Sequence, residues 1–281
     1  MLVKDSVRQP VMDAVQSLLA ASDDARIIVQ SVEAVLPREN DEVPVAQRAT
    51  REELYSQIEK DTRLDGNFLV LVFLSTVVAA IGLLENNVAV IIGAMVIAPL
   101  LGPNIALAFA TTLGDRDLLL KSFKTNMVGV ALALSLSILI GWFWPPITLN
   151  PEILARTYVG FDDVVLALAS GAAAVLSLTS GVASALVGVM VAVALLPPTA
   201  TLGMVLASGQ HQLATGAALL LAVNIVCVNM SANLVFLFKG VRPRTWLEKR
   251  KARQSVVWLG LFWAIALAVL LFAVGLRVVE T

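Results

Sequence analysis

The sequence is poor in the residues from which soluble enzymes and metal sites are built. Its 281 residues include one cysteine, Cys227, and one histidine, His211, so an internal disulfide is excluded and no zinc-ligand spacing occurs. No aspartate or glutamate lies between residues 164 and 247, which removes the buried carboxylate relay expected of a proton-coupled pump. A serine–base arrangement and a glycine-rich phosphate loop are missing as well. We expect neither an enzyme nor a bound cofactor, and the sequence leaves open whether a metal ion binds.

Charged residues are also scarce. They make up 15% of the chain, hydrophobic residues make up 58%, and the mean hydropathy is +0.84, which excludes an ordinary soluble composition. Apolar runs long enough to cross about 30 Å of hydrocarbon recur from residue 68 onward. We predict an all-α membrane protein with about seven transmembrane helices, at residues 68–84, 88–112, 120–144, 163–180, 182–207, 213–238 and 256–276.

Only the first 66 residues are polar enough to lie in water. Residues 1–45 combine a short amphipathic helix, a β-branched run and a charged linker, which predicts a soluble α/β fragment too small to bury a core alone. Residues 46–66 predict a cytoplasmic connector helix that begins at the capping box of Thr50 and Glu53 and ends at Gly66. Its thin apolar stripe favours a surface connector over a docking role.

Basic residues are concentrated in segments that fall on one side of the predicted spans. They lie before the first span, between the second and third spans, and most densely in the loop 239–255, whereas the opposite side carries few. The positive-inside rule then places the N-terminus in the cytoplasm and the C-terminus outside, in a multi-pass protein of the cell membrane. The lipid bilayer is the partner that this composition implies, and we expect no nucleic-acid partner.

The second predicted span contains helix-breaking residues near its middle. The segment GAMVIAPLLGPN, residues 93–104, carries Pro99, Pro103 and Asn104 within an apolar run. Proline in a helix interior costs about 3 kcal/mol, and the carbonyl groups it frees find no water in hydrocarbon. Such a break persists only where it is buried in protein or lines a wet cavity.

A similar pattern recurs later in the chain. Setting Gly93 against Gly188 aligns GAMVIAPLLGPNIALAF with GVMVAVALLPPTATLGM, and a further shift of three residues sets Asn126 over Asn224. We interpret this as an inverted repeat, because two units of three spans each must cross the membrane in opposite directions. The predicted domains are transmembrane repeat 1 at 67–144, an outer loop at 145–161, transmembrane repeat 2 at 162–238, the basic cytoplasmic loop at 239–255, and the seventh span with the C-terminus at 256–281.

The second copy predicts an interruption of the fifth span at Pro197 and Pro198, which leaves the carbonyl groups near Val193 and Ala194 without amide partners. Broken helices in inverted repeats are typical of transporters, whose sites lie near the membrane midplane. The uncharged site expected there could hold an alkali cation on carbonyl groups or an anion at a helix N-terminus. Alternatively, the prolines only kink the helices and bind nothing. The candidate substrate-binding residues are Pro99, Pro103, Asn104, Pro197, Pro198, Thr199, Thr201, Asn126 and Asn224.

Two further sets of residues bear on helix packing. In the sixth span, Asn224 with Ser231 and Asn229 with Asn233 form two polar stripes, for which interhelical hydrogen bonds are the favoured use and a polar path the second. In the fourth and fifth spans, small residues four apart permit close helix contact within a chain or between protomers, so we expect a homo-oligomer. These pairs are Ser177/Gly181, Gly181/Ala185 and Ser184/Gly188.

Residues 54–115 resemble a known family of hydrophobic membrane proteins, domain of unknown function 389. The most specific part is NNVAVIIGAMVIAPLLGP, Asn86 to Pro103, and the likeness extends to about residue 240. The segment IIVQSVEAVLPRE also resembles the end of the family's soluble N-terminal region, which looks like a small ferredoxin-like domain, here present only in its second half. The resemblance implies the membrane fold and no activity, because the family has no assigned chemistry.

Two functions follow from these features. The first is a membrane transporter or channel for a small solute or ion, with its site where the two proline-broken helices meet near the midplane. The alternative is a membrane-embedded sensor or scaffold that signals through its cytoplasmic N-terminal region, with the basic loop 239–255 drawn to anionic lipid. Deletion of residues 1–46 should abolish the second function, whereas a transporter could keep its flux.

Overall fold

The computed structural model of the chain describes residues 11, 12, 14, 15, 51–144, 149–180, 184–241 and 260–275. Within these ranges, the structure describes residues 51–53, 180 and 184–194 by their backbone alone. The α/β fragment predicted over residues 1–45 and the basic loop predicted over 239–255 therefore lie almost entirely outside the described residues. Most of the small-residue pairs around Gly181 lie outside them too.

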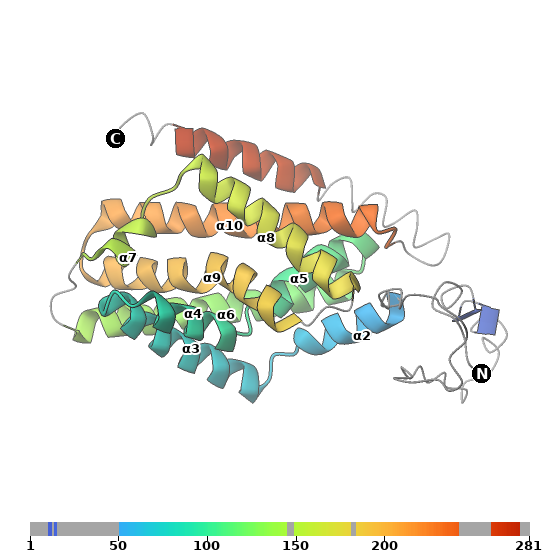
Figure 1. The fold of residues 1–281 in the computed structure, drawn as a ribbon, viewed down its shortest axis with the longest axis horizontal. Helices are drawn as coiled ribbons and strands as arrows, with labels where there is room; N and C mark the ends of the chain where they lie inside the picture. Colours follow the sequence, from blue (N-terminus) through green and yellow to red (C-terminus); the bar gives the residue numbers. More distant parts are fainter. Residues whose placement is uncertain are drawn as a thin grey trace, which may run out of the picture.

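Every regular element in the described ranges is a helix, and no strand occurs there. Figure 1 labels helices α2 to α10, and an unlabelled C-terminal helix follows at Gly260–Gly275. The labelled series is α2 (Arg51–Asp61), α3 (Gly66–Leu84), α4 (Val88–Ile97), α5 (Leu101–Leu113), α6 (Arg116–Phe143), α7 (Pro151–Ala155), α8 (Phe161–Ser180), α9 (Ser184–Ala207) and α10 (His211–Phe238).

Short polar side chains start four of these helices. Asp65, Asn87, Asp115 and Asn150 each accept a backbone N–H from the first turn of α3, α4, α6 and α7 respectively. These hydrogen bonds satisfy donors that have no partner within the helix, which fixes where each helix begins. In the turn between α3 and α4, Asn86 takes a left-handed backbone conformation (φ 55°), which asparagine tolerates better than most residues.

Several helices are long and apolar enough to cross a membrane. Four of them qualify separately, namely α3, α6, α8 and α10, and the bent pair α4–α5 makes a fifth if it counts as one span. The described part of α9 from Leu195 to Ala207 and the helix Gly260–Gly275 are shorter apolar segments at two further predicted positions. The chain is thus a multi-pass helical membrane protein with at least four spans.

The distribution of polarity is inverted relative to a water-soluble protein. Large apolar side chains, such as those of Val70, Phe73 and Val165, are exposed on the outside of the bundle. Polar side chains, such as those of Ser137 and Asn229, are buried. Exposed aromatic side chains gather where α6 ends and α8 begins, which is typical of a membrane boundary. These aromatic residues are Trp142, Phe143, Trp144, Tyr158 and Phe161.

The long helices lie side by side along a common direction, with α7 at one end of the bundle and α2 at the other (Figure 1). One cluster of buried residues lies between α3, α4, α6 and α9, and a second surrounds α5, α8 and α10. A third joins Trp263 of the C-terminal helix to Leu107 of α5 and Val226 of α10. The short helix α5 therefore contributes to two of these three clusters.

Candidate functional site

The pair α4–α5 is broken at Pro99, and its halves meet at an angle of 54°. α4 ends at Ile97, and Ala98 has the extended backbone (φ −66°, ψ 121°) that a residue before proline prefers. α5 then begins at Leu101 without a side-chain cap at Leu100. The sequence-based prediction of a helix broken at Pro99 is confirmed.

The second half of this pair, α5, is a half-helix enclosed by protein. All its residues from Pro103 to Thr112 are buried, and α2, α6, α8 and α10 pack around it. Pro103 falls in the first turn, where its missing N–H would have no partner within the helix. Gly102 allows α2 to approach closely, because a Cβ there would lie 2.7 Å from the carbonyl oxygen of Asp61. The half-helix therefore begins inside the bundle, seated against the end of α2.

Near the start of α5, Asn104 forms a buried side-chain pair with Asn229 of α10. The Nδ2 of Asn229 donates to the Oδ1 of Asn104 at 2.6 Å and to the carbonyl oxygen of Ile225 at 2.9 Å. These bonds leave the Nδ2 of Asn104 and the Oδ1 of Asn229 without partners, although both side chains are fully buried. An unsatisfied buried polar group costs about 1–3 kcal/mol, so one open donor and one open acceptor at the same place call for a ligand or an ordered water.

Polar contacts continue from this pair along the interface of α5 and α10. Asn233, one turn beyond Asn229, donates its Nδ2 to the Asn229 carbonyl oxygen at 2.9 Å. Its Oδ1 accepts a hydrogen bond of 3.0 Å from the Oγ1 of Thr112, near the other end of α5. Asn104, Asn229, Asn233 and Thr112 thus form a polar ladder that runs through an otherwise apolar interface.

Two of the other predicted site residues also have buried polar atoms without partners, namely the Oδ1 of Asn126 on α6 and the Oγ1 of Thr201 on α9. Asn126 lies one turn before Gly129, and a Cβ on Gly129 would come within 2.8 Å of Leu100 at the break. Within the described residues, no hydrogen bond joins Asn126 or Thr201 to Asn104. These two side chains therefore lie on other helices and do not belong to the ladder.

α9 passes through Pro197 and Pro198 as one helix, Ser184–Ala207. The interruption predicted at these prolines is wrong. Helices α3, α4, α6, α8 and α10 all pack against α9, and neighbouring helices can hold a proline-containing segment in helical form. The two prolines still lack N–H groups, so the carbonyl groups of Val193 and Ala194 have no amide partner within the helix.

The two proline segments nevertheless lie in one apolar cluster. Ala98 and Leu100 from the break share it with Leu195 and Ala200, which flank the prolines of α9. Thr199, between them, is buried and donates its Oγ1 to the Leu195 carbonyl oxygen at 2.7 Å. The structure therefore brings together the two segments that the sequence comparison paired, with one of them broken and the other continuous.

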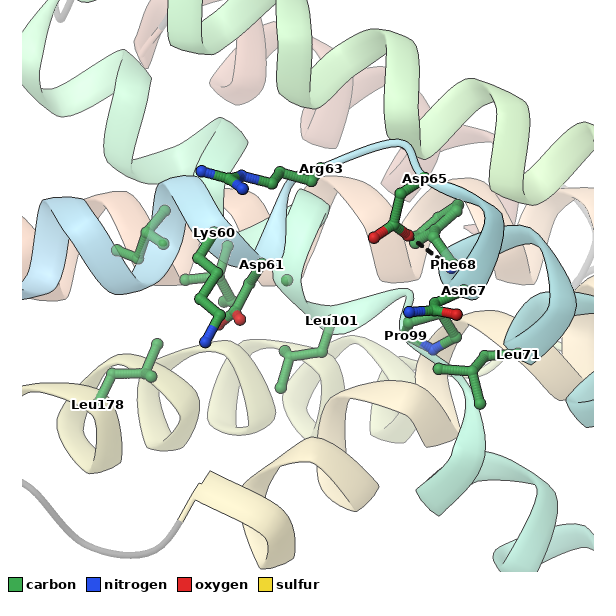
Figure 2. A pocket seen from close by; sticks show the side chains of 13 residues that line it. Lys60, Asp61, Arg63, Asp65, Asn67, Phe68, Leu71, Pro99, Leu101 and Leu178 are labelled. Atoms are coloured by element: carbon green, nitrogen blue, oxygen red, sulfur yellow. Dashed lines mark hydrogen bonds between the residues drawn. The ribbon is translucent and has the colours of Figure 1, made fainter.

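A pocket of about 300 Å³ lies where α2, the start of α3 and the break between α4 and α5 meet (Figure 2). We call it the α2 pocket. Leu178 of α8 closes one side, and the lining residues Gly102 and Ile105 come from the first turns of α5. Its polar lining consists of Lys60, Asp61, Arg63, Asp65 and Asn67, and its apolar lining of Ile58, Phe68, Leu71, Pro99, Leu101, Gly102, Ile105 and Leu178.

Charge is confined to the α2 side of this region. Burial raises the pKa of Asp61, and the neighbouring Lys60 acts in the opposite direction. By contrast, α5 and α10 contain no Asp, Glu, Lys or Arg, so the polar ladder is uncharged. Across the part of the chain that the structure describes, no three His, Cys, Asp or Glu side chains gather as a metal site.

α2 is docked on the bundle, which corrects the prediction of a surface connector. It ends at Asp61, and Gly66 begins α3 instead of ending the connector. Leu54 and Ile58 are 3% exposed and join the cluster around α5, because even a thin apolar stripe suffices against apolar α5 residues such as Ile105 and Phe109. The Tyr55 hydroxyl donates to the Asp115 carboxylate at 2.8 Å.

Two contacts to α6 complete this docking. The Oγ1 of Thr125 donates to the Thr62 carbonyl oxygen at 2.9 Å, and Lys121 forms an exposed ion pair with Glu59 at 3.2 Å. Exposed pairs of this kind contribute little stability, so the buried hydrogen bond and the apolar stripe carry most of the docking. The helix before the first span is thereby coupled to the half-helix.

The sequence names Asn104 as a candidate site residue, and also Asn224, because Asn224 aligns with Asn126 in the repeat. For Asn229 and Asn233 it favours interhelical hydrogen bonds, and their bonds with Asn104 and Thr112 confirm this prediction. The partner of Asn104 is Asn229, and Asn224 is buried one and a half turns earlier on α10. The four-residue spacing of Asn229 and Asn233 indicates that both lie on one stripe of the helix. The sequence of a single helix does not reveal which neighbouring helix that stripe faces.

A family model and a known relative both match the part of the chain that contains Asn104 and Asn229. A family model described as Domain of unknown function (DUF389) matches residues 95–230, a range that contains both Asn104 and Asn229. The "Uncharacterized protein MJ0678" of Methanocaldococcus jannaschii is 34% identical over 93% of this chain and 81% of its own length. No solved structure matches the chain.

Proposed function

The chain belongs to the family described as Domain of unknown function (DUF389), and we propose that it is a membrane transporter or channel for a small solute or ion. The site we infer lies at the start of the buried half-helix α5, beside the break at Pro99. The proposal rests on this chain's own residues, because neither the family description nor the relative's name states an activity.

The observation that carries the proposal is the Asn104–Asn229 pair. Two carboxamides are bonded to each other inside an apolar bundle, and each keeps one hydrogen-bonding atom unused. Interhelical hydrogen bonds in membranes contribute only about 0.6–2 kcal/mol each, and the unused atoms offset part of that gain. Apolar side chains would pack the same space at lower cost, so the pair favours a binding role over a purely structural one.

We infer a path that follows the polar ladder. From Asn104 and Asn229 it continues past Asn233 and Thr112 to the α2 end of the bundle, through an interface without charged side chains. Beyond the break, the carbonyl groups of Val193 and Ala194 on α9 supply acceptors, since Pro197 and Pro198 have no N–H to give them. Irregular backbone at membrane depth is tolerated where it lines such a cavity.

The finer architecture is part of the same proposal. With α9 and the C-terminal helix as spans, the bundle has seven, and the units α3–α6 and α8–α10 form an inverted repeat. Basic residues at the α2 end then make that end cytoplasmic, with the C-terminus outside, in the cell membrane. The homo-oligomer expected from the small residues stays a prediction. The described basic side chains at this end include Lys60, Arg63, Arg116, Lys121, Lys124 and Lys239.

The test is ligand-dependent stability of the detergent-purified protein. We would record the melting temperature against monovalent and divalent cations, inorganic anions, organic acids, amino acids and small neutral solutes. A ligand at 100 times its Kd stabilises the folded state by about 2.7 kcal/mol, and this gain should disappear in Asn104→Ala but persist in Ser135→Ala. Ser135 is the control because its side chain is exposed on α6 and bonds only its own helix. A ligand-dependent rise in melting temperature that persists in both variants would show that the ligand binds away from Asn104.

A sensor or scaffold is the second candidate function, and the docking of α2 supports it. Tyr55, Ile58 and Thr62 tie the segment before the first span to α5 and α6, so a change in the N-terminal region could reach the half-helix. Deletion of residues 1–46 leaves α2 intact. Loss of function on this deletion, with ligand binding unchanged, would favour the sensor over the transporter.

A further inference from the structure

The open atoms of the Asn104–Asn229 pair are of opposite kinds. The Nδ2 of Asn104 is a donor and the Oδ1 of Asn229 is an acceptor, both are buried, and both belong to side chains held by the same 2.6 Å hydrogen bond. The second hydrogen of Asn229 Nδ2 is used by the Ile225 carbonyl oxygen, so Asn229 cannot turn around without losing that bond. The arrangement of one free donor beside one free acceptor is therefore held in place.

We propose that this pair binds a small uncharged molecule that carries a hydrogen-bond acceptor and a donor close together, such as a primary carboxamide or a polyol. The inference rests on the proposed transport function and deepens it by naming the substrate class. The acceptor of the solute takes the free N–H of Asn104, and its donor gives a hydrogen to the Oδ1 of Asn229. Both unsatisfied atoms are then paired, and no charge is buried.

Ions fit the same pair poorly. A cation requires several oxygen ligands, and the free N–H of Asn104 would point its positive end at the ion. An anion requires donors, and the free Oδ1 of Asn229 would repel it. Neither α5 nor α10 supplies a charged side chain to compensate, and burial of an uncompensated charge is far costlier than burial of a neutral polar group.

The α2 pocket points to the same class of solute. Its polar lining carries two basic side chains, Lys60 and Arg63, and two acidic ones, Asp61 and Asp65, so its formal charge is balanced. A vestibule that concentrates one kind of ion would be lined by charges of one sign. The pocket adjoins the start of α5, since Gly102 and Ile105 line it on either side of Asn104 in the sequence.

The test measures solute and ion permeation in parallel on proteoliposomes of the full chain. Acetamide and glycerol are the neutral probes, followed by light scattering as vesicles reswell; potassium and chloride are the ionic probes, followed by a potential-sensitive dye. The decisive variant is Asn104→Leu/Asn229→Leu, which removes the open atoms and their partners together and so leaves the fold nearly unaffected. Ser135→Ala is the matched control, and melting temperatures establish that all three proteins are folded.

We expect acetamide or glycerol to enter wild-type vesicles faster than protein-free vesicles, and the double variant to slow this about tenfold, the factor that corresponds to 1.4 kcal/mol. Ionic flux should stay at the protein-free level. Protein-dependent potassium or chloride flux that the double variant abolishes, with neutral probes at the protein-free level, would overturn the substrate class and leave transport standing. No protein-dependent flux of any probe would overturn both. Neutral flux that the double variant keeps would overturn the assignment to this pair.

Discussion

Two segments of the chain place proline in an apolar helix, and they behave differently. At Pro99 the helix stops, and its halves meet at 54°. At Pro197 and Pro198, where two N–H groups are missing in succession, α9 continues. Local chemistry would predict the reverse, because two prolines remove more hydrogen bonds than one. The difference must therefore come from the surroundings of each segment.

Those surroundings are specific at the break. Gly102 admits the carbonyl group of Asp61, Leu100 packs near Gly129, and Asn104 reaches Asn229, contacts that depend on where the half-helix starts and points. Around α9, by contrast, six helices (α3, α4, α5, α6, α8 and α10) pack against one continuous helix. A proline thus permits a bend, and tertiary contacts decide whether the bend forms.

The largest expected effect tests this contrast directly. Pro197→Ala supplies an N–H to the Val193 carbonyl group within a continuous helix, and we expect it to raise the free energy of unfolding by up to about 3 kcal/mol. Pro99→Ala adds an N–H where Ala98 is extended and no helix can be completed, so it should instead cost about 0.4–1 kcal/mol through greater freedom of the unfolded chain. Both changes are measured by unfolding titration in mixed micelles.

Equal effects of the two substitutions would break the comparison. In particular, a destabilised Pro197→Ala would mean that α9 depends on its proline and is interrupted after all. Circular dichroism on the same samples should show unchanged helix content in both variants, because α9 is already continuous at Pro197 and the break at Pro99 remains.

The next effect concerns the seat of the half-helix. A methyl group at Gly102 would lie 2.7 Å from the Asp61 carbonyl oxygen, and backbone cannot move aside as a flexible side chain can. We expect Gly102→Ala to destabilise the protein by about 1–3 kcal/mol. Gly93→Ala is the matched control in α4, because no atom lies within 4 Å of its added Cβ; it should be neutral or stabilise by about 0.5–1 kcal/mol.

Equal melting temperatures of Gly102→Ala and Gly93→Ala would contradict the close packing of Asp61 of α2 against Gly102 of α5. Protease accessibility of the segment before α3 gives a second readout, since undocking of α2 should expose it in Gly102→Ala alone.

The polar pair should show a smaller and non-additive effect. Asn104→Ala leaves an N–H of Asn229 unsatisfied in addition to its Oδ1, and we expect a loss of about 1–2 kcal/mol. Asn104→Leu/Asn229→Leu removes both partners and should lie within about 0.5 kcal/mol of the wild type. Unfolding titrations of the single and double variants measure the coupling. A double variant that loses as much as both single changes together would show that the pair is not coupled.

Helix positions could be predicted from the sequence because apolar length and polar caps are local properties. The fourth span, predicted at 163–180, is observed at Phe161–Ser180, and α6 begins four residues earlier than predicted because Asp115 caps it. The possibility of a break at Pro99 is also visible locally, because the residue before a proline prefers the extended backbone that Ala98 adopts, although packing decides that the break forms.

The rest depends on which helices become neighbours, and that is not a local property. The continuity of α9 at Pro197, the choice of Asn229 as the partner of Asn104, and the docking of α2 all follow from packing around α5. The two apolar residues Leu54 and Ile58 look insignificant on an isolated helix. They become a docking surface because they join buried apolar residues of α5, such as Ile105 and Phe109.

The smallest expected effect tests the tie between α2 and the start of α6. Tyr55→Phe removes the hydrogen bond to Asp115 and keeps the ring contact with Phe109, whose centroid lies 6.2 Å away. We expect a loss of about 1 kcal/mol at neutral pH. Ser135→Ala is the control, because it also removes one hydroxyl group, and that hydroxyl is exposed on α6 and bonds only its own helix.

The pH dependence sharpens this last prediction. Burial, and then the hydrogen bond and charge of Asp115, raise the pKa of Tyr55 to about 12 from its ordinary value of 10.0. The unfolded chain therefore releases this proton first, so the stabilisation is complete below pH 10 and is lost as the pH rises toward 12. Melting temperatures of the wild type should fall more steeply over that window than those of Tyr55→Phe, and the wild type should show a late tyrosinate absorbance step that the variant lacks. If the two pH profiles ran parallel, Tyr55 would not be held by Asp115, and α2 would rest on its apolar stripe alone.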